Sequence, residues 1–330
     1  MNRRSFQILL GTALGALAVL PFPLSADAQG WPNRPITMVQ PFAAGGGMDP
    51  VGRLVGDALT QKFGQQVIMD YRAGANGAIG TAFAAKTPPD GYTLLINPGG
   101  PMINAKYMMK DIPYDTLRDF IPISKIVETP LVIIVNTERV QAKTLAELVA
   151  YAKANPEKIS AANVGTGSGG HLSAALLEKI AGIKLTHVAY KGTGQMMADI
   201  TGGQVDMTIN FFAGFGQLVD AGKLRVLAVL GKENIPESLK KFPTAAQAGF
   251  PDLLSTGWYG LYVPTGTPVD IVNKIRDTVT ESFKTPAVSA KLADLGYVVT
   301  STSTAELTQF LKDEDVKWGS LIKSVGLTPQ

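Results

Sequence analysis

The chain has 330 residues, with 30 lysines and arginines against 27 aspartates and glutamates, which gives a net charge of +3. Because the opposite charges are interspersed and no basic run occurs, we expect no nucleic-acid partner. With no cysteine and only two histidines, the chain lacks most of the side chains used in nucleophilic or metal chemistry. We therefore expect no metal and no cofactor.

The first 28 residues (1–28) predict a cleaved signal peptide. A short basic region with Arg3 and Arg4 precedes an apolar run of 13 residues, and Ala26-Asp27-Ala28 is typical of a cleavage site. Since a helix needs ~20 apolar residues to cross a bilayer, this run is too short to span one. The paired arginines are compatible with general or with twin-arginine export. We expect a mature chain that begins near Gln29 and functions in the periplasm.

After this segment, β-type runs alternate with helical ones, which predicts an α/β architecture with mostly parallel sheets. The remaining length favours two domains rather than one. The expected strands are 36–42, 66–71, 92–97, 131–136, 159–163, 185–190, 206–211, 224–230, 258–263 and 297–300.

Several helices are predicted from the residues at their starts. Asp49 before Pro50 is typical of an N-cap followed by proline at the first helical position. Thr144 and Ser303 each precede a glutamate by three residues, which is the spacing of a capping box. Thr267 precedes a proline and predicts a further helix start.

Four glycine-rich stretches each follow a strand and precede a helical run, namely 45–47, 74–77, 97–100 and 165–170. The first turn of a helix has backbone N–H groups without an intrahelical partner and carries roughly half a positive charge. Glycine lets a ligand approach these groups closely. The pattern therefore predicts capture of an anion rather than its chemical conversion.

Two other functions match parts of this pattern. Ser168 and His171 are close in sequence and would serve an exported hydrolase acting on a carboxylate ester, although no Gly-x-Ser-x-Gly elbow surrounds the serine. The glycines of 165–170 also match a dinucleotide fingerprint, but 188–191 offer no ribose-binding acid.

A series of short motifs follows in fixed order from Trp31 to the C-terminus. They are WPNRPI (31–36), PFAAGGGMD (41–49), GANGAIG (74–80), DGYTLL (90–95), GTGSGGHL (165–172), YKG (190–192), GGQVD (202–206), PTA (243–245), AG (248–249), WYG (258–260) and GTP (266–268). In these motifs and their spacing the chain resembles the Bug family, the periplasmic solute receptors of tripartite tricarboxylate transporters.

The resemblance implies an α/β, two-lobed periplasmic-binding-protein fold of type II, with a ligand cleft between the lobes. It implies that residues 29–128 and 257–330 form one discontinuous lobe and residues 129–256 the other, with crossovers near 127–131 and 256–262. It implies a receptor that is no enzyme and works as a monomer. Such a receptor captures a di- or tricarboxylate, or an aromatic carboxylate such as terephthalate, and passes it to the membrane subunits of the transporter.

The resemblance also implies that backbone amides and small hydroxyls hold the ligand carboxylate. The implied carboxylate-binding residues are Ala44, Gly45, Gly46, Gly47, Met48 and Asp49 from one lobe and Gly167, Ser168, Gly169, Gly170 and His171 from the other. The residues expected to line the cleft are Asn97, Pro98, Tyr190, Thr193, Asp206 and Phe212. Met48 stands where the family often has a small or hydroxyl residue, and it is the departure most able to change ligand choice.

Overall fold

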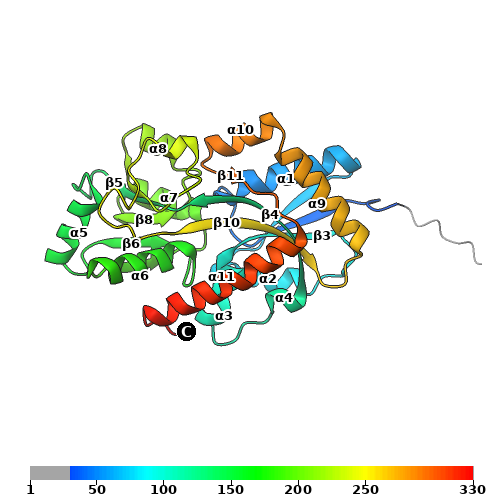
Figure 1. Cartoon of the computed structure of the whole chain (residues 1–330), viewed down its shortest axis with the longest axis horizontal. Coiled ribbons are helices and arrows are strands. Elements are labelled where there is room, and N and C mark those ends of the chain that lie inside the picture. The colour runs from blue at the N-terminus through cyan, green and yellow to red at the C-terminus, as the bar shows by residue number, and fades with distance from the viewer. Residues whose placement is uncertain (1–29, 330) are drawn as a thin grey trace, which may run out of the picture.

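The structure, a computed structural model, describes residues 30–329, so the expected signal peptide lies outside the described residues. Two mixed β-sheets with helices packed on them form two lobes (Figure 1). Within residues 30–329, none of the helices has both the length and the apolar character needed to cross a membrane.

The first lobe contains a six-stranded sheet in the order β11-β4-β10-β3-β1-β2. Its strands are β1 (Ile36–Gln40), β2 (Val67–Tyr71), β3 (Thr93–Pro98), β4 (Phe120–Pro130), β10 (Thr256–Pro264) and β11 (Val298–Val299). Its helical elements are α1 (Met48–Phe63), η1 (Ala75–Gly77), α2 (Ala78–Ala84), η2 (Gly100–Asn104), α3 (Ala105–Met108), α4 (Thr116–Asp119), α9 (Val269–Phe283), α10 (Pro286–Asp294) and α11 (Thr304–Ser324).

The second lobe contains a five-stranded sheet in the order β7-β6-β8-β5-β9. Its strands are β5 (Val132–Asn136), β6 (Ser160–Asn163), β7 (Thr186–Ala189), β8 (Met207–Asn210) and β9 (Leu224–Val229). Its helical elements are α5 (Leu145–Ala154), α6 (Gly169–Ala181), α7 (Thr193–Thr201), α8 (Gly216–Asp220) and η3 (Glu237–Leu239).

Helices cover both faces of the first sheet because its strands are apolar on both sides. Leu94 and Ile96 of β3 belong to a buried cluster with the apolar residues of α1 and α9. Leu95, between them, belongs to a second cluster with Leu311 and Trp318 of α11. The two-residue period of the strand therefore explains why α11 lies on the opposite face from α1 and α9.

Two neighbouring segments connect the lobes. β4 and β10 pair antiparallel along their length, from Thr256 opposite Pro130 to Pro264 opposite Phe120. At the end of β4 the pairing continues, since the Leu131 N–H donates to the Ser255 carbonyl at 2.9 Å. The crossovers expected near 127–131 and 256–262 fall on these strands, while the exact domain boundaries stay a prediction.

The ten expected strands are present, each within two residues of its expected bounds. Two expectations about the sheets were wrong. β4 was not predicted, because Pro122, Lys125 and Glu128 interrupt its apolar pattern and its burial comes from β10 and β11 on either side. The sheets are also not mostly parallel: β10 is antiparallel to β3 and β4, and β5 is antiparallel to β8 and β9.

The start of α1 differs from the expected one. Its N-cap is Gly47, which has no side-chain cap, so Asp49 lies in the first turn. The Asp49 carboxylate instead accepts hydrogen bonds from the Gly45 N–H at 2.9 Å and the Tyr71 hydroxyl at 2.6 Å. The capping box at Ser303 is confirmed. The one expected at Thr144 is only half formed: the threonine caps the Glu147 N–H, but the Glu147 carboxylate accepts from the Lys143 N–H and not from the cap residue.

Candidate ligand-binding site

Two adjoining pockets lie between the lobes. The glycine pocket has a water-accessible cavity volume of about 50 Å³ and is lined by Gln40, Phe42, Ala43, Gly46, Gly47, Met48, Asp49, Pro98, Val164, Thr193, Asn210, Phe211 and Tyr259. The tryptophan pocket has a water-accessible cavity volume of about 60 Å³ and is lined by Phe42, Asn76, Pro98, Gly99, Gly100, Asn104, Leu131, Val164, Ser168, Gly169, Gly170, Asn210, Phe211, Ser255, Thr256, Gly257, Trp258, Glu314 and Trp318. Both lobes contribute to both pockets, and the five shared lining residues place them side by side.

The first lobe presents free backbone amides to the glycine pocket. Gly46, Gly47 and Met48 line this pocket at the start of α1. Among residues 30–329, no acceptor is bonded to their N–H groups. The Tyr297 hydroxyl donates to the Gly47 carbonyl at 2.9 Å, which holds that peptide from outside the pocket. The uncapped helix start can therefore receive an anion.

The second lobe presents a similar helix start to the tryptophan pocket. Ser168 caps α6 by accepting the His171 N–H at 3.3 Å, while the N–H groups of Gly169 and Gly170 have no acceptor in the described part of the chain. A side chain at position 170 would collide with the carbonyl oxygen of Ile209 in β8. Glycine is needed there for α6 to start against β8.

The lobes are in contact on two sides of the pockets. On one side, a β-carbon placed on Gly46 would lie 3.4 Å from Cβ of Thr193. On the other, Asn104 Nδ2 donates to the Gly167 carbonyl at 2.9 Å. A ligand in these pockets would thus be bounded by both lobes.

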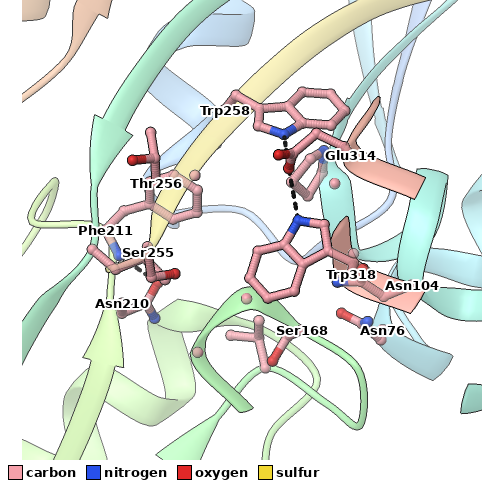
Figure 2. A pocket seen from close by; sticks show the side chains of 18 of the residues that line it. Asn76, Asn104, Ser168, Asn210, Phe211, Ser255, Thr256, Trp258, Glu314 and Trp318 are labelled. Atoms are coloured by element: carbon pink, nitrogen blue, oxygen red, sulfur yellow. Dashed lines mark hydrogen bonds between the residues drawn. The ribbon is translucent and has the colours of Figure 1, made fainter. Parts of the chain in front are cut away.

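Asn76 and Asn104 were not predicted as site residues. Both line the tryptophan pocket (Figure 2), and Oδ1 and Nδ2 of Asn76 and Oδ1 of Asn104 are buried without a hydrogen-bond partner. A buried polar atom without a partner costs about 1–3 kcal/mol, so such atoms mark places where a ligand or water completes the bonding. The signal for Asn76 in the sequence was the 74–77 glycine stretch, where this residue has φ 48° and ψ 41°.

Aromatic side chains form much of the remaining wall. Trp258 of β10 and Trp318 of α11 direct their indole N–H groups at Glu314 (Figure 2), at 3.4 Å and 2.6 Å from Oε2. Phe211 lies between both pockets and stacks on Tyr259 with ring centroids 5.0 Å apart. Neither tryptophan was predicted as a site residue, although both line the tryptophan pocket.

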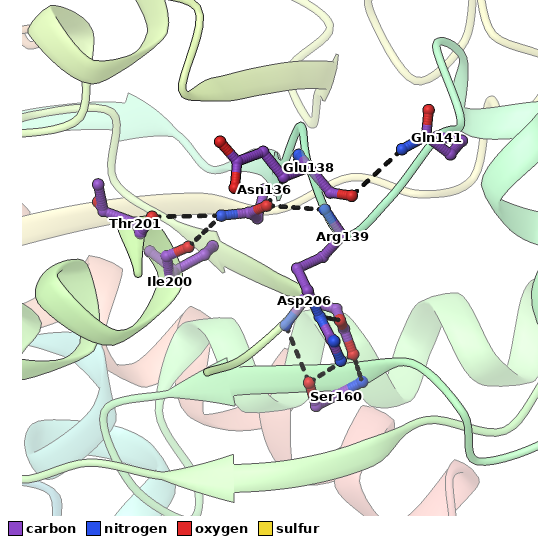
Figure 3. Close-up of polar contacts among 8 residues, drawn as sticks. All are labelled: Asn136, Glu138, Arg139, Gln141, Ser160, Ile200, Thr201 and Asp206. Carbon is purple, nitrogen blue, oxygen red and sulfur yellow. Dashed lines mark hydrogen bonds and ion pairs between the residues drawn. The ribbon is translucent and has the colours of Figure 1, made fainter. Parts of the chain in front are cut away.

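Asp206 lies away from both pockets. It precedes β8, whereas the pocket residue Asn210 ends that strand. Its carboxylate accepts the Ser160 N–H at 2.8 Å, the Ser160 hydroxyl at 2.6 Å and Arg139 Nε at 3.1 Å (Figure 3). These bonds tie β6 to β8 inside the second lobe, so the expected place in the cleft was wrong for Asp206.

Phe212 also lies elsewhere. It is buried in the second lobe with its ring 5.7 Å from that of Phe242, and its neighbour Phe211 takes the position at the pockets. Successive residues near the end of a strand point to opposite sides, which explains why Phe211 lines the pockets and Phe212 does not.

The other expected residues divide into lining and supporting positions. Pro98, Thr193 and Ser168 line one or both pockets, together with the glycines and the first-turn residues already described. The supporting positions line neither pocket and are Ala44, Gly45, Asn97, Gly167, His171 and Tyr190.

Two supporting side chains make bonds within their own lobe. The Tyr190 hydroxyl donates to Asp199 at 2.9 Å, and burial together with this carboxylate raises the pKa of Tyr190 to about 12. Asn97 Nδ2 donates to the Thr81 hydroxyl at 2.8 Å in the core of the first lobe.

The hydrolase alternative lacks its central contact. His171 Nδ1 accepts the Gly167 N–H at 3.2 Å, and its ring packs edge-on against His187 with centroids 5.0 Å apart. Among residues 30–329, the hydroxyl of Ser168 bonds to the backbone N–H of His171 and not to its imidazole, as a general base would require. Burial, with a smaller contribution from His187, lowers the pKa of His171 to about 4.

No group of three or more histidine, aspartate or glutamate side chains that could hold a metal ion occurs among residues 30–329. The charged side chains that line the pockets are Asp49 in the glycine pocket and Glu314 in the tryptophan pocket. Neither pocket is lined by a lysine or arginine, so an anion must be held there by neutral donors.

The chain is similar to known solute receptors over nearly its whole length. Residues 51–327 match the family described as the tripartite tricarboxylate transporter family receptor. Protein BugT of Bordetella pertussis is 31% identical over 327 residues, covering 99% of each chain. A protein of Pseudomonas sp. strain P51, described as a UPF0065 protein in the tcbD-tcbE intergenic region, is 33% identical over 96% of this chain and 93% of its own.

Solved structures agree with this result. Rpa4515 of R. palustris with adipate has a TM-score of 0.88 and 31% identity, covering 91% of this chain and 100% of its own. The periplasmic binding protein BugD has a TM-score of 0.85 and 31% identity at the same coverage. MatC of Rhodopseudomonas palustris with bound malate has a TM-score of 0.83 and 28% identity over 88% of this chain and 100% of its own. These proteins bind solutes and are not enzymes, and the chain belongs to the same family, the solute-binding receptors of tripartite tricarboxylate transporters.

Proposed function

We propose that the protein is an extracytoplasmic receptor that captures a small organic carboxylate between its two lobes. The observation that carries this proposal is the pair of helix starts with free amides, Gly46 to Met48 in the first lobe and Gly169 to Gly170 in the second. Because the two pockets adjoin, one carboxylate where they meet would receive donors from both lobes.

Hydrogen bonds from backbone donors can account for the binding free energy of a micromolar complex. A hydrogen bond to a charged group contributes about 1.5–3 kcal/mol, whereas a helix terminus adds only about 0.3–1 kcal/mol. Three or four such bonds would provide the ~8 kcal/mol of a micromolar complex after the costs of association. Oriented N–H groups therefore hold the anion, and the helix dipole assists.

The proposed contacts come from three kinds of residue. Backbone amides of Gly46, Gly47, Met48, Gly169 and Gly170 bind the carboxylate, and Ser168, Thr193, Asn76 and Asn104 add side-chain polar groups. Phe42, Pro98, Phe211, Trp258 and Trp318 enclose the ligand body. Asp206 and Phe212 are left out, since each packs inside the second lobe.

The family and its neighbours support this function. The neighbours carry adipate and malate, which are both small carboxylates. We infer that this protein works in the periplasm as a monomer and passes its ligand to the membrane subunits of a tripartite tricarboxylate transporter. The lobes would open and close about β4 and β10, the paired segments that join them.

A thermal-shift screen of the chain from Gln29 onward tests the proposal. Malate, adipate, citrate, benzoate, 4-hydroxybenzoate and terephthalate are added separately. At a concentration near 100 times Kd, a ligand adds about 2.7 kcal/mol of stability and raises Tm by several degrees. Mass spectrometry of the recovered ligand should give an unchanged mass. Unchanged melting curves with all six acids would contradict the proposed receptor function.

A further inference from the structure

Glu314 is a buried acid that lines both the tryptophan pocket and a surface groove beyond Trp258. It projects from α11, is 6% exposed and accepts hydrogen bonds from both indoles of the pocket. Its other oxygen, Oε1, accepts from Lys317 Nζ at 2.8 Å. Lys317 is 56% exposed and lines this surface groove, so its charge lies outside the ligand pocket.

The two indoles offer a ligand apolar ring atoms and no free donor. Both N–H groups are directed at Glu314 (Figure 2), and the nearby wall includes Leu131 and Phe211. The part of the pocket around Glu314 therefore combines an aromatic surface with an acidic acceptor. A negative group placed there would face the Glu314 carboxylate, whose charge Lys317 offsets only in part and from outside the pocket, which is unfavourable.

Asn104 gives a second, independent indication of the same polarity. Its Nδ2 is fixed toward the Gly167 carbonyl, which leaves its Oδ1 without a partner, while Oδ1 and Nδ2 of Asn76 are also unpartnered in the tryptophan pocket. Asn104 is 2% exposed, so water outside the pocket does not satisfy its oxygen. A water or a ligand group that carries a donor can complete the bonding of this oxygen, whereas an ionised carboxylate cannot.

We infer that Glu314 is a specificity-determining residue that excludes a second carboxylate at the tryptophan end. The ligand class is then a monocarboxylate with a flat, apolar body whose far end carries a hydrogen-bond donor such as a hydroxyl. This inference rests on the proposed carboxylate capture and adds the choice among carboxylates. It separates this chain from neighbours that hold the dicarboxylates adipate and malate.

Calorimetry with two matched ligands tests the inference. 4-Hydroxybenzoate and terephthalate share a ring and a first carboxylate and differ at the far end. For the parent protein, we expect the ratio of the terephthalate Kd to the 4-hydroxybenzoate Kd to be at least ~10. Glu314→Gln should reduce this ratio by ~10-fold or more, because the amide removes the like charge and can donate to the second carboxylate.

Two further variants make the test independent of folding damage at position 314. Lys317→Met keeps the Glu314 carboxylate and removes its paired cation, so the ratio should rise above that of the parent. Glu128→Gln is the matched control, since Glu128 lines the outer groove and neither ligand pocket. Its ratio should equal that of the parent.

A parent protein that binds terephthalate as tightly as 4-hydroxybenzoate would overturn the inference. An unchanged ratio in both Glu314→Gln and Lys317→Met would also overturn it. If malate or adipate binds and the hydroxy acid does not, the receptor function stands and the choice of ligand class is wrong. If none of these acids binds, the proposed function itself fails.

Discussion

The two ligand-facing helix starts are supported in opposite ways. The loop before α1 is held from outside, by Tyr297 on the Gly47 carbonyl and Tyr71 on the Asp49 carboxylate. The loop before α6 is held by its own side chains, with Ser168 capping the helix and His171 accepting the Gly167 N–H. Substitutions in the first loop should therefore reduce binding, whereas those in the second should also reduce stability.

The largest effect is expected for Gly46→Val. The valine methyl groups would fill the contact with Thr193 and the space in front of the free amides of α1. We expect Kd to rise by ~1,000-fold or more, about 4 kcal/mol, with the Tm of the unliganded protein nearly unchanged. Calorimetry and thermal melts measure both.

Gly30→Val is the control for this variant, because a β-carbon at position 30 meets nothing within 4 Å. If Gly46→Val lowers the unliganded Tm as strongly as it weakens binding, the contrast between the loops does not hold.

A pH effect should come from the second loop. Burial lowers the pKa of His171 from 6.5 to about 4, so between these values the unfolded chain binds a proton that the folded chain does not. The contribution of His171 to the free energy of unfolding should therefore be fully present above pH 6.5, and roughly 3 kcal/mol should be lost as the pH drops through 4.

His171→Asn keeps an acceptor for the Gly167 N–H and removes the titrating ring. Denaturant melts at several pH values should show a weaker loss of stability for this variant than for the parent between pH 6.5 and 4. Parallel curves would mean that His171 is not the group responsible.

Ser168→Ala tests the helix cap. Loss of a serine N-cap costs about 1 kcal/mol, so Tm should fall by ~2–4 °C for a chain of this size. Binding should weaken less than in Gly46→Val, since the amides of Gly169 and Gly170 remain. A Ser168→Ala variant with normal stability and no binding would favour side-chain chemistry and reopen the hydrolase alternative. Ser168→Thr, which keeps the cap, is the matched control.

The smallest effect is expected for Asn104→Ala. It removes one hydrogen bond between the lobes, to the Gly167 carbonyl, which is worth about 0.5–1.5 kcal/mol. The unliganded protein should populate more open states and show a slightly larger radius of gyration in small-angle scattering. An unchanged scattering curve would mean that this bond does not hold the lobes together.

Local patterns predicted local features well. Apolar runs indicated ten strands, and Ser303 with Glu306 indicated a capping box that is present. The glycine stretches indicated free amides because the first turn of a helix has unpartnered N–H groups and a glycine beside it leaves them accessible. The long strand β4 was missed because its prolines and charges obscure an apolar pattern that its neighbours complete.

The parts of the site that were missed depend on distant segments. Phe211 and Phe212 are adjacent and chemically alike, so only the position of β8 decides which one faces the pockets. Glu314 and Trp318 reach the tryptophan pocket because α11 returns from the end of the chain to the first lobe. Such contacts join segments that are far apart in the sequence, and no residue spacing within α11 indicates them.

The most direct measurement of the central claim is the backbone amide spectrum of ¹⁵N-labelled protein during titration with a carboxylate that binds. The proton resonances of Gly46, Gly47, Gly169 and Gly170 should move downfield together, with one half-saturation point, since charge-assisted hydrogen bonds form in both lobes at once. If these four resonances stay in place at saturation while others move, backbone capture between the two helix starts is contradicted.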